Sequence, residues 1–212
     1  MRIYLLQKGK VGAVGRNVGA TSAIGSAALE ALMAGPSSSE RAAGWTSDVP
    51  AGAVSNLRIA GGVATIDLAA PLSHEALAQV VYTLTQFPTI KRVRASRTIP
   101  GTKPYTRADF EDVTPVILIE APLPGQTVAS PVDVRGTANT FEATFDLEVR
   151  NSSGVRVAWR FVTATSGSGQ RGTFGATISF PRTGGPLTLV AYEPSAANGR
   201  PIHVVRVQLQ EG

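Results

Sequence analysis

Hydrophobic residues in the first half of the chain recur with the periods of both strands and helices. A short run of strand-forming residues occupies positions 2–6. Apolar side chains recur with helical spacing over residues 22–34 and again over 74–87, and Ser73 offers an N-cap for the second of these helices. Between the first strand and the first helix the chain is rich in glycine, and we expect a second short strand near residues 13–18.

A hairpin is expected between the two helices. Residues 54–60 and 63–69 alternate apolar and polar positions, and the two glycines between them can adopt the positive φ angles that a two-residue turn requires. Residues 90–98 then form a basic strand. The order β-α-β-β-α-β predicts an α+β domain over residues 1–99, with two helices packed on one sheet.

The second half has no helical pattern. Short apolar runs separated by turn-forming residues recur at the spacing of about seven strands, and from Phe141 to Val149 every second residue is apolar. This pattern predicts an all-β immunoglobulin-like sandwich over residues 115–212. Trp159 fits either a plug between the two sheets or an exposed edge position. Residues 100–114 are polar, contain proline and glycine, and predict a linker between the domains.

Composition restricts the chemistry that the chain can perform. Its 212 residues include no cysteine and two histidines, which excludes disulfides, thiolate metal sites and a cysteine nucleophile. The apolar runs are far shorter than the roughly 18 residues that span a bilayer. No phosphate-binding loop, zinc-protease motif or hydrolase nucleophile elbow occurs. We therefore expect no metal site, no cofactor and no catalytic residues.

Positive charge is concentrated in the first half of the chain. The sequence has 20 Lys and Arg against 15 Asp and Glu, and the excess lies mainly in a run without acidic residues: Lys91, Arg92, Arg94, Arg97, Lys103 and Arg107. Such a run either attracts an anionic partner or protects an exposed strand edge from pairing. Nucleic acid is not the expected anion, because residues 57–60 and 63–68 contain no aromatic side chain on which a base could stack.

An enzymatic alternative depends on two carboxylates. Asp67 or Glu142 would serve a carbohydrate-active or peptidoglycan-modifying enzyme, and Glu142 shares an alternating face with Asp146 and Glu148. A solvated strand face explains the same pattern without any chemistry.

Several longer motifs resemble two families of bacterial domains. The first half resembles the GerM-type sporulation and spore-germination domain (GerMN). The motifs that carry this resemblance are the run from Ala27 to Leu32, Gly35-Pro36, Thr46-Ser47, the run from Gly62 to Leu68 and, most specifically, the run from Gln79 to Pro88. The second half resembles the immunoglobulin-like domain of bacterial spore germination. The motifs that carry this resemblance are Ser130-Pro131, the run from Gly136 to Asn139, Phe141-Glu142, the run from Gly172 to Phe174, and the run from Tyr192 to Ser195.

The resemblance implies a non-enzymatic scaffold or adaptor of the bacterial cell envelope. It implies an extracytoplasmic, cell-surface location with attachment to the membrane, often as a lipoprotein. No signal peptide or lipobox is visible, so we expect the anchor to lie outside this sequence. The expected partner is an envelope protein or a cell-wall polymer, together with self-association through the first domain.

We expect binding residues at two places. In the first domain the candidates are one residue pair from the family motifs and the basic strand: Thr46, Ser47, Lys91, Arg92, Arg94 and Arg97. In the second domain the candidates, which could equally serve the fold, are Phe141, Glu142, Tyr192 and Glu193.

Overall fold

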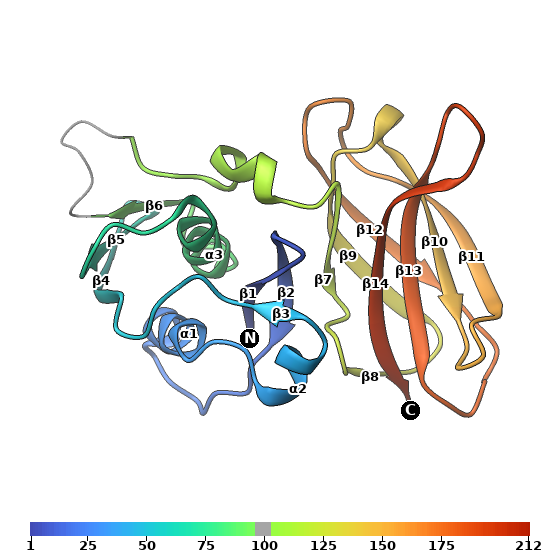
Figure 1. Ribbon diagram of the computed structural model, residues 1–212, viewed down its shortest axis with the longest axis horizontal. Helices are drawn as coiled ribbons and strands as arrows, with labels where there is room; N and C mark the ends of the chain where they lie inside the picture. Colours follow the sequence, from blue (N-terminus) through green and yellow to red (C-terminus); the bar gives the residue numbers. More distant parts are fainter. Residues whose placement is uncertain (96–102) are drawn as a thin grey trace. The chain divides into compact units, whose positions relative to one another are not determined.

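The computed structural model describes residues 1–95 and 103–212 and divides into two compact units, Met1–Thr114 and Pro115–Gly212 (Figure 1). The first unit is α+β and the second is a β-sandwich, which confirms the predicted fold class. None of the helices in the described residues is long and apolar enough to cross a membrane.

The strands of the first unit form two three-stranded sheets in the described residues. The first sheet has the order β2-β1-β3 and is built from β1 (Arg2–Gln7), β2 (Lys10–Gly15) and β3 (Trp45–Thr46). The second has the order β4-β5-β6 and is built from β4 (Val54–Ala60), β5 (Val63–Leu68) and β6 (Arg92–Ala95). The single sheet expected from the sequence is thus replaced by two.

Two helices lie between these sheets, and a single sheet could not cover both sides of them. Helix α1 (Ile24–Met33) contacts β1 and β4, and α3 (His74–Leu84) contacts β1, β2 and β6 (Figure 1). A short helix, α2 (Ser38–Ala42), follows α1 and was not expected. Every residue of α3 from Ala78 to Leu84 is buried, so the helix needs apolar cover on more than one side.

Local signals in the first unit behave as the sequence predicts. Strands β4 and β5 pair antiparallel across Gly61 and Gly62, whose φ angles of 55° and 78° are both positive. The Ser73 hydroxyl accepts a hydrogen bond from the Ala76 N–H at 3.1 Å and so caps α3.

The second part of the expected linker, residues 103–114, packs against the first unit. Tyr105 exchanges two backbone hydrogen bonds with Val93 of β6, and a 3₁₀ helix, η1 (Arg107–Val113), follows. Phe110 is buried against the rings of His74 and Tyr105, with centroid distances of 4.9 and 5.8 Å. Burial of Phe110 therefore makes these residues part of the domain rather than a free connection.

The second unit is a sandwich of two antiparallel sheets that agrees with the immunoglobulin-like prediction. One sheet has the order β12-β9-β7, and its strands are β7 (Ile117–Ala121), β9 (Val132–Ala138) and β12 (Gly172–Ile178). The other has the order β11-β10-β13-β14-β8, with β8 added in parallel, and its strands are β8 (Thr127–Val128), β10 (Thr144–Arg150), β11 (Arg156–Thr163), β13 (Leu187–Pro194) and β14 (Pro201–Glu211).

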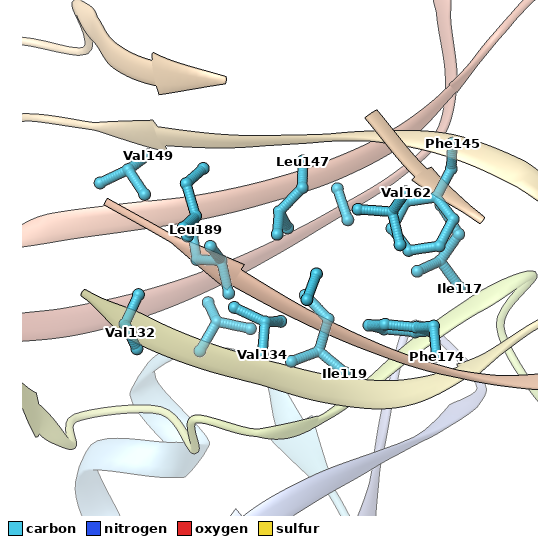
Figure 2. Packing of buried hydrophobic residues seen from close by; sticks show 14 of the residues in the cluster. Ile117, Ile119, Val132, Val134, Phe145, Leu147, Val149, Val162, Phe174 and Leu189 are labelled. Carbon is cyan, nitrogen blue, oxygen red and sulfur yellow. The ribbon is translucent and has the colours of Figure 1, made fainter. Parts of the chain in front are cut away.

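Alternating residues of both sheets fill the space between them (Figure 2). Ile119 and Val134 come from one sheet, and Leu147 and Leu189 come from the other. Phe145 meets Phe174 edge-on, with ring centroids 4.8 Å apart. Without any cysteine, this packing holds the two sheets together.

Two details of the sandwich differ from the sequence pattern. The alternation from Phe141 to Val149 predicts one strand, but β10 begins at Thr144 and Phe141–Ala143 form a 3₁₀ turn, η2. The φ angles of Glu142 and Ala143 are 54° and 59°, and this left-handed backbone interrupts a strand. Trp159 lies on the edge strand β11 and is 53% exposed, so it does not plug the core.

Candidate functional site

The outer face of the sheet β4-β5-β6 gathers positive charge. In β6, Val93 and Ala95 point toward the helices and are buried, so Arg92 and Arg94 project from the opposite face. The strand register places Arg58 of β4 beside Thr65 of β5, and Thr65 beside Arg94. We call Arg58, Arg92 and Arg94 the basic sheet face.

The register also sets the spacing of these charges. Arg58 and Arg94 are two strands apart, which separates their Cα atoms by about 10 Å, and Arg92 and Arg94 are two residues apart, which is about 7 Å. Arg58 is distant from the basic run in sequence and was not singled out there. A register shift in the β4–β5 pairing, between Ser55 and Arg58, determines its partner, and no sequence pattern shows that shift.

Little of this charge is neutralised within the first unit. Asp67 lies on the same face, where it accepts a hydrogen bond from Asn56 Nδ2 at 3.0 Å and lies 3.7 Å from Nη2 of Arg58. Within residues 1–95 and 103–212, no carboxylate forms an ion pair with Arg92 or Arg94. Lys91, exposed just before β6, adds to the positive charge nearby, and Arg97 lies outside the described residues.

The remaining members of the basic run have structural partners. Lys103 Nζ lies 3.2 Å from Oδ1 of Asp109. The Arg107 guanidinium lies over the rings of Tyr82 and Tyr4, 4.6 and 5.3 Å from their centroids. Its Nε donates to the Thr85 hydroxyl at 2.8 Å. Of the described members of the run, Lys91, Arg92 and Arg94 are therefore exposed at β6. Arg107 attaches residues 103–114 to the domain, whereas Lys103 pairs within that segment.

Thr46 and Ser47 occupy different environments. Thr46 is exposed on β3, opposite Leu6. The Ser47 hydroxyl accepts hydrogen bonds from Gln79 Nε2 at 3.2 Å and from the Val49 N–H at 3.3 Å. Ser47 is thus part of the packing of α3, and neither residue joins the basic sheet face.

In the second unit, Phe141 and Glu193 come together. The Phe141 N–H donates to Glu193 Oε1 at 2.9 Å, which fixes the start of η2, and the Phe141 side chain is 62% exposed. Glu142 follows on the same turn, where its N–H donates to Ser168 Oγ at 3.1 Å. His203 Nε2 is 3.9 Å from the other oxygen of Glu193. The Glu193 carboxylate and the backbone of Glu142 therefore organise this loop.

Tyr192 belongs to a separate, buried network around Glu148. Its hydroxyl donates to Glu148 Oε1 at 3.0 Å, and Arg150 and Arg156 approach the same carboxylate to 2.6 and 3.2 Å. Burial raises the pKa of Glu148, but the hydrogen bonds from Arg150, Tyr192 and Arg156 outweigh it and lower that pKa overall. Burial and the Glu148 carboxylate together raise the pKa of Tyr192 to about 12.

The two carboxylates of the enzymatic alternative lie in different surroundings. Asp67 contacts Asn56 and Arg58, and Glu142 lies on a turn rather than beside Asp146 and Glu148 on a strand. Among the described residues, no three His, Asp or Glu side chains gather closely enough to hold a metal ion.

The structure thus defines a two-domain protein, in which an α+β domain with a basic sheet face precedes an immunoglobulin-like sandwich. Residues 2–95 match the family described as "Sporulation and spore germination", and residues 116–200 match the "Immunoglobulin-like domain of bacterial spore germination". Each domain thus belongs to one of these families, in the order that the sequence motifs indicate.

Comparison with individual proteins adds little. Among curated proteins, none matches the chain. A solved structure of an engineered protein from the Northeast Structural Genomics Consortium is 16% identical, and the match covers 66% of this chain and 37% of that one. The chain therefore spans well under half of that protein, and the TM-score of 0.35 is too low to support any inference.

Proposed function

We propose that the chain is a non-enzymatic interaction protein of the bacterial cell envelope, and that its first domain binds an anionic cell-wall polymer through the basic sheet face. The observation that supports this proposal is the set of three guanidinium groups on one face of the sheet β4-β5-β6, of which Arg92 and Arg94 form no ion pair among the described residues. Membership of the sporulation and spore-germination families supports the envelope context.

The geometry suits a flexible polymer that carries many negative charges. A single exposed charge pair contributes at most about 1 kcal/mol, so one phosphate on one arginine would bind weakly. Guanidinium groups about 7 to 10 Å apart can engage successive anionic groups of one polymer at the same time, and linked contacts strengthen each other. Salt weakens such binding, because the Debye length is about 8 Å at physiological ionic strength.

The proposal places the protein outside the cytoplasm, attached to the membrane as a lipoprotein or by another anchor. In that position the first domain would hold the wall polymer, and the sandwich would act as a spacer or as a second binding surface. A protein partner in the envelope and self-association through the first domain are further parts of the proposal, with no residue assigned to either.

Binding to purified teichoic acid, a glycerol-phosphate polymer, tests the polymer proposal. The variant Arg58→Glu/Arg92→Glu/Arg94→Glu reverses the basic sheet face, while Arg182→Glu changes an exposed arginine in the second unit and serves as the control. We expect saturable binding that weakens at least tenfold in the triple variant, which is about 1.4 kcal/mol, and that falls with added salt.

The controls separate this proposal from general attraction between opposite charges. Circular dichroism should show that the triple variant keeps its fold. Wall fragments stripped of teichoic acid should bind less than intact fragments. Equal losses in the triple variant and in Arg182→Glu, or no loss in either, would contradict a site on this face.

A further inference from the structure

Strand β11 forms a free edge of the larger sheet in the second unit. It lies at the end of the order β11-β10-β13-β14-β8, and it pairs along its length with β10 alone among the described strands. An edge strand of this kind leaves alternate backbone N–H and C=O groups available to another chain.

Two large aromatic side chains project from this edge. Trp159 and Phe161 are each 53% exposed, and their register opposite Glu148 and Asp146 places them on the outer face of the sheet. Val155, just before the strand, is 58% exposed. Exposed apolar side chains grouped in this way commonly mark an interaction surface.

Three other edge strands of the described sheets differ from β11. The edge strand β12 exposes only small or polar residues, namely Thr173, Gly175 and Thr177. Strand β4 has a register shift within its pairing, and the outer side of β6 is bridged by Tyr105. The β10–β11 pairing shifts only at its far end, between Val149 and Arg150, so β11 stays regular through its aromatic segment.

Charge indicates which kind of strand fits this edge. Strand β11 contains Arg156 and Arg160 and no carboxylate. Arg156 forms an ion pair with the buried Glu148. The exposed Arg160 donates to the Thr177 carbonyl and forms no ion pair among the described residues. Pairing with β11 of a second copy would place Arg160 of both copies on one face of the joined sheet with no acid from either strand, which is unfavourable. An acidic strand has the complementary charge.

We propose that β11 accepts an extended acidic segment of a partner protein, which adds to the sheet as a further strand. Backbone hydrogen bonds to the free edge would supply affinity, and alternate apolar side chains of the segment would cover Trp159 and Phe161. Carboxylates on the other face of the added strand would lie beside Arg160. This surface is in the second domain and does not depend on the polymer site proposed for the first.

A labelled eight-residue peptide that alternates glutamate and valine tests this inference by fluorescence anisotropy with the full chain. We expect saturable binding that weakens at least tenfold in Trp159→Ser/Phe161→Ser and in Arg160→Glu. The control Ile202→Ser, which changes an exposed apolar residue on β14, should bind as the unchanged protein does. Amide hydrogen exchange along β11 should slow when the peptide is bound.

Two matched peptides and one measurement of mass make the test decisive. A peptide with lysine in place of glutamate should bind at least tenfold more weakly, and N-methylation of alternate peptide bonds should abolish binding. Absence of saturable binding, or binding that ignores N-methylation or the aromatic double variant, would overturn the proposal. So would sedimentation that shows a dimer which Trp159→Ser/Phe161→Ser dissociates, because the occupant would then be a second copy.

Discussion

The side-chain amide of Gln86 pairs with the peptide groups of Arg2 as a neighbouring strand would. Its Oε1 accepts from the Arg2 N–H at 3.0 Å, and its Nε2 donates to the Arg2 carbonyl at 2.6 Å. Within α3, which ends two residues before Gln86, the Thr83 hydroxyl accepts from the Tyr4 N–H at 3.1 Å and Gln79 Nε2 donates to the Tyr4 carbonyl at 3.0 Å. Strand β3 pairs only with Leu6 and Gln7, so α3 satisfies the rest of this edge of β1.

This arrangement gives a structural reason for the most specific motif of the first domain, the run from Gln79 to Pro88. Gln79 and Thr83 of α3 and Gln86, two residues after the end of the helix, recur at helical spacing and form one polar row. Buried peptide groups need partners, and here side chains take the place of a third full-length strand. The motif is therefore explained by the fold rather than by a binding site.

Replacing Gln86 with leucine should destabilise the first domain. The side chain keeps a similar size, but the N–H and C=O of Arg2 lose their partner, which costs about 1–2 kcal/mol for part-buried groups. Urea unfolding with the first domain's own probe, the tryptophan Trp45, measures this change. Gln86→Glu places a carboxylate oxygen against the Arg2 and Thr83 carbonyls and should destabilise at least as much as Gln86→Leu. An unchanged midpoint in Gln86→Leu would show that water replaces the amide.

Removing the Glu148 carboxylate should destabilise the sandwich. Glu148→Ala leaves the Tyr192 hydroxyl without its acceptor and leaves Arg150 and Arg156 without a counter-charge, which we expect to cost about 2 kcal/mol because both arginines can still turn toward water. Tyr192→Phe should cost about 1 kcal/mol. Asp133→Asn, at an exposed pair on the other sheet, is the control and should change little.

The same network predicts the titration of one tyrosine. Burial and the Glu148 carboxylate raise the pKa of Tyr192 to about 12, so its phenol should remain protonated at pH values where an ordinary tyrosine ionises. In Glu148→Gln the negative charge is gone, and the pKa should move back toward 10. Carbon-13 labelling of tyrosine with NMR detection follows this residue directly. A Tyr192 pKa near 10 in the unchanged protein would contradict the network.

Glu211 should make the stability of the sandwich depend on pH. Its carboxylate accepts from the Thr183 hydroxyl at 2.7 Å, the Thr183 N–H at 2.9 Å and the Gly184 N–H at 2.6 Å, and these bonds lower its pKa below the usual 4.5. A carboxyl group with a lowered pKa in the folded state stabilises fully above its unfolded pKa, and this contribution is lost as the pH falls through the folded pKa.

Glu211→Gln should therefore be less stable than the unchanged protein at pH 7, and the difference should shrink steadily below about pH 4.5. Thermal unfolding of both proteins across pH 3 to 7 measures the difference, with Glu142→Gln as the control on an exposed turn. If the difference in stability between the two proteins stays constant with pH, the negative charge of Glu211 does not contribute to stability.

Regular alternation made much of the fold predictable from the sequence. The hairpin of β4 and β5 was expected at residues 54–60 and 63–69 and is found at Val54–Ala60 and Val63–Leu68, because its period and its Gly61-Gly62 turn are both local signals. The sandwich follows from the same kind of pattern. The second sheet of the first domain did not, because Gln79 and Thr83 look solvent-facing by their polarity although both are buried.

The candidate sites were less predictable because they depend on register. Arg92 and Arg94 were found from their run of charge, but Arg58 joins them only through the pairing of β4 with β5. Glu148 alternates like a solvated residue, and its burial comes from partners on three strands. Trp159 could be a plug or an edge residue until the order of the strands was known.

One pair of neighbouring glycines tests how tightly the smaller sheet of the sandwich is built. Gly136 of β9 has no room for a side chain, since a Cβ there would lie 2.0 Å from the Leu118 carbonyl oxygen and 2.9 Å from Cζ of Phe174. Gly175 of β12, opposite Arg135 in the same sheet, has nothing within 4 Å of a Cβ. Gly136→Ala must push β7 away from β9, whereas Gly175→Ala adds a methyl group in open space.

We expect Gly136→Ala to lose at least about 3 kcal/mol of unfolding free energy or to fail to fold, and Gly175→Ala to change stability by less than about 1 kcal/mol. Because glycine is unfavourable in a strand interior, the second variant should if anything be slightly more stable. Thermal unfolding followed by circular dichroism compares the two. Similar stability of both variants would mean that β7 and β9 can separate freely, and the close approach at Leu118 would then contribute nothing to the fold.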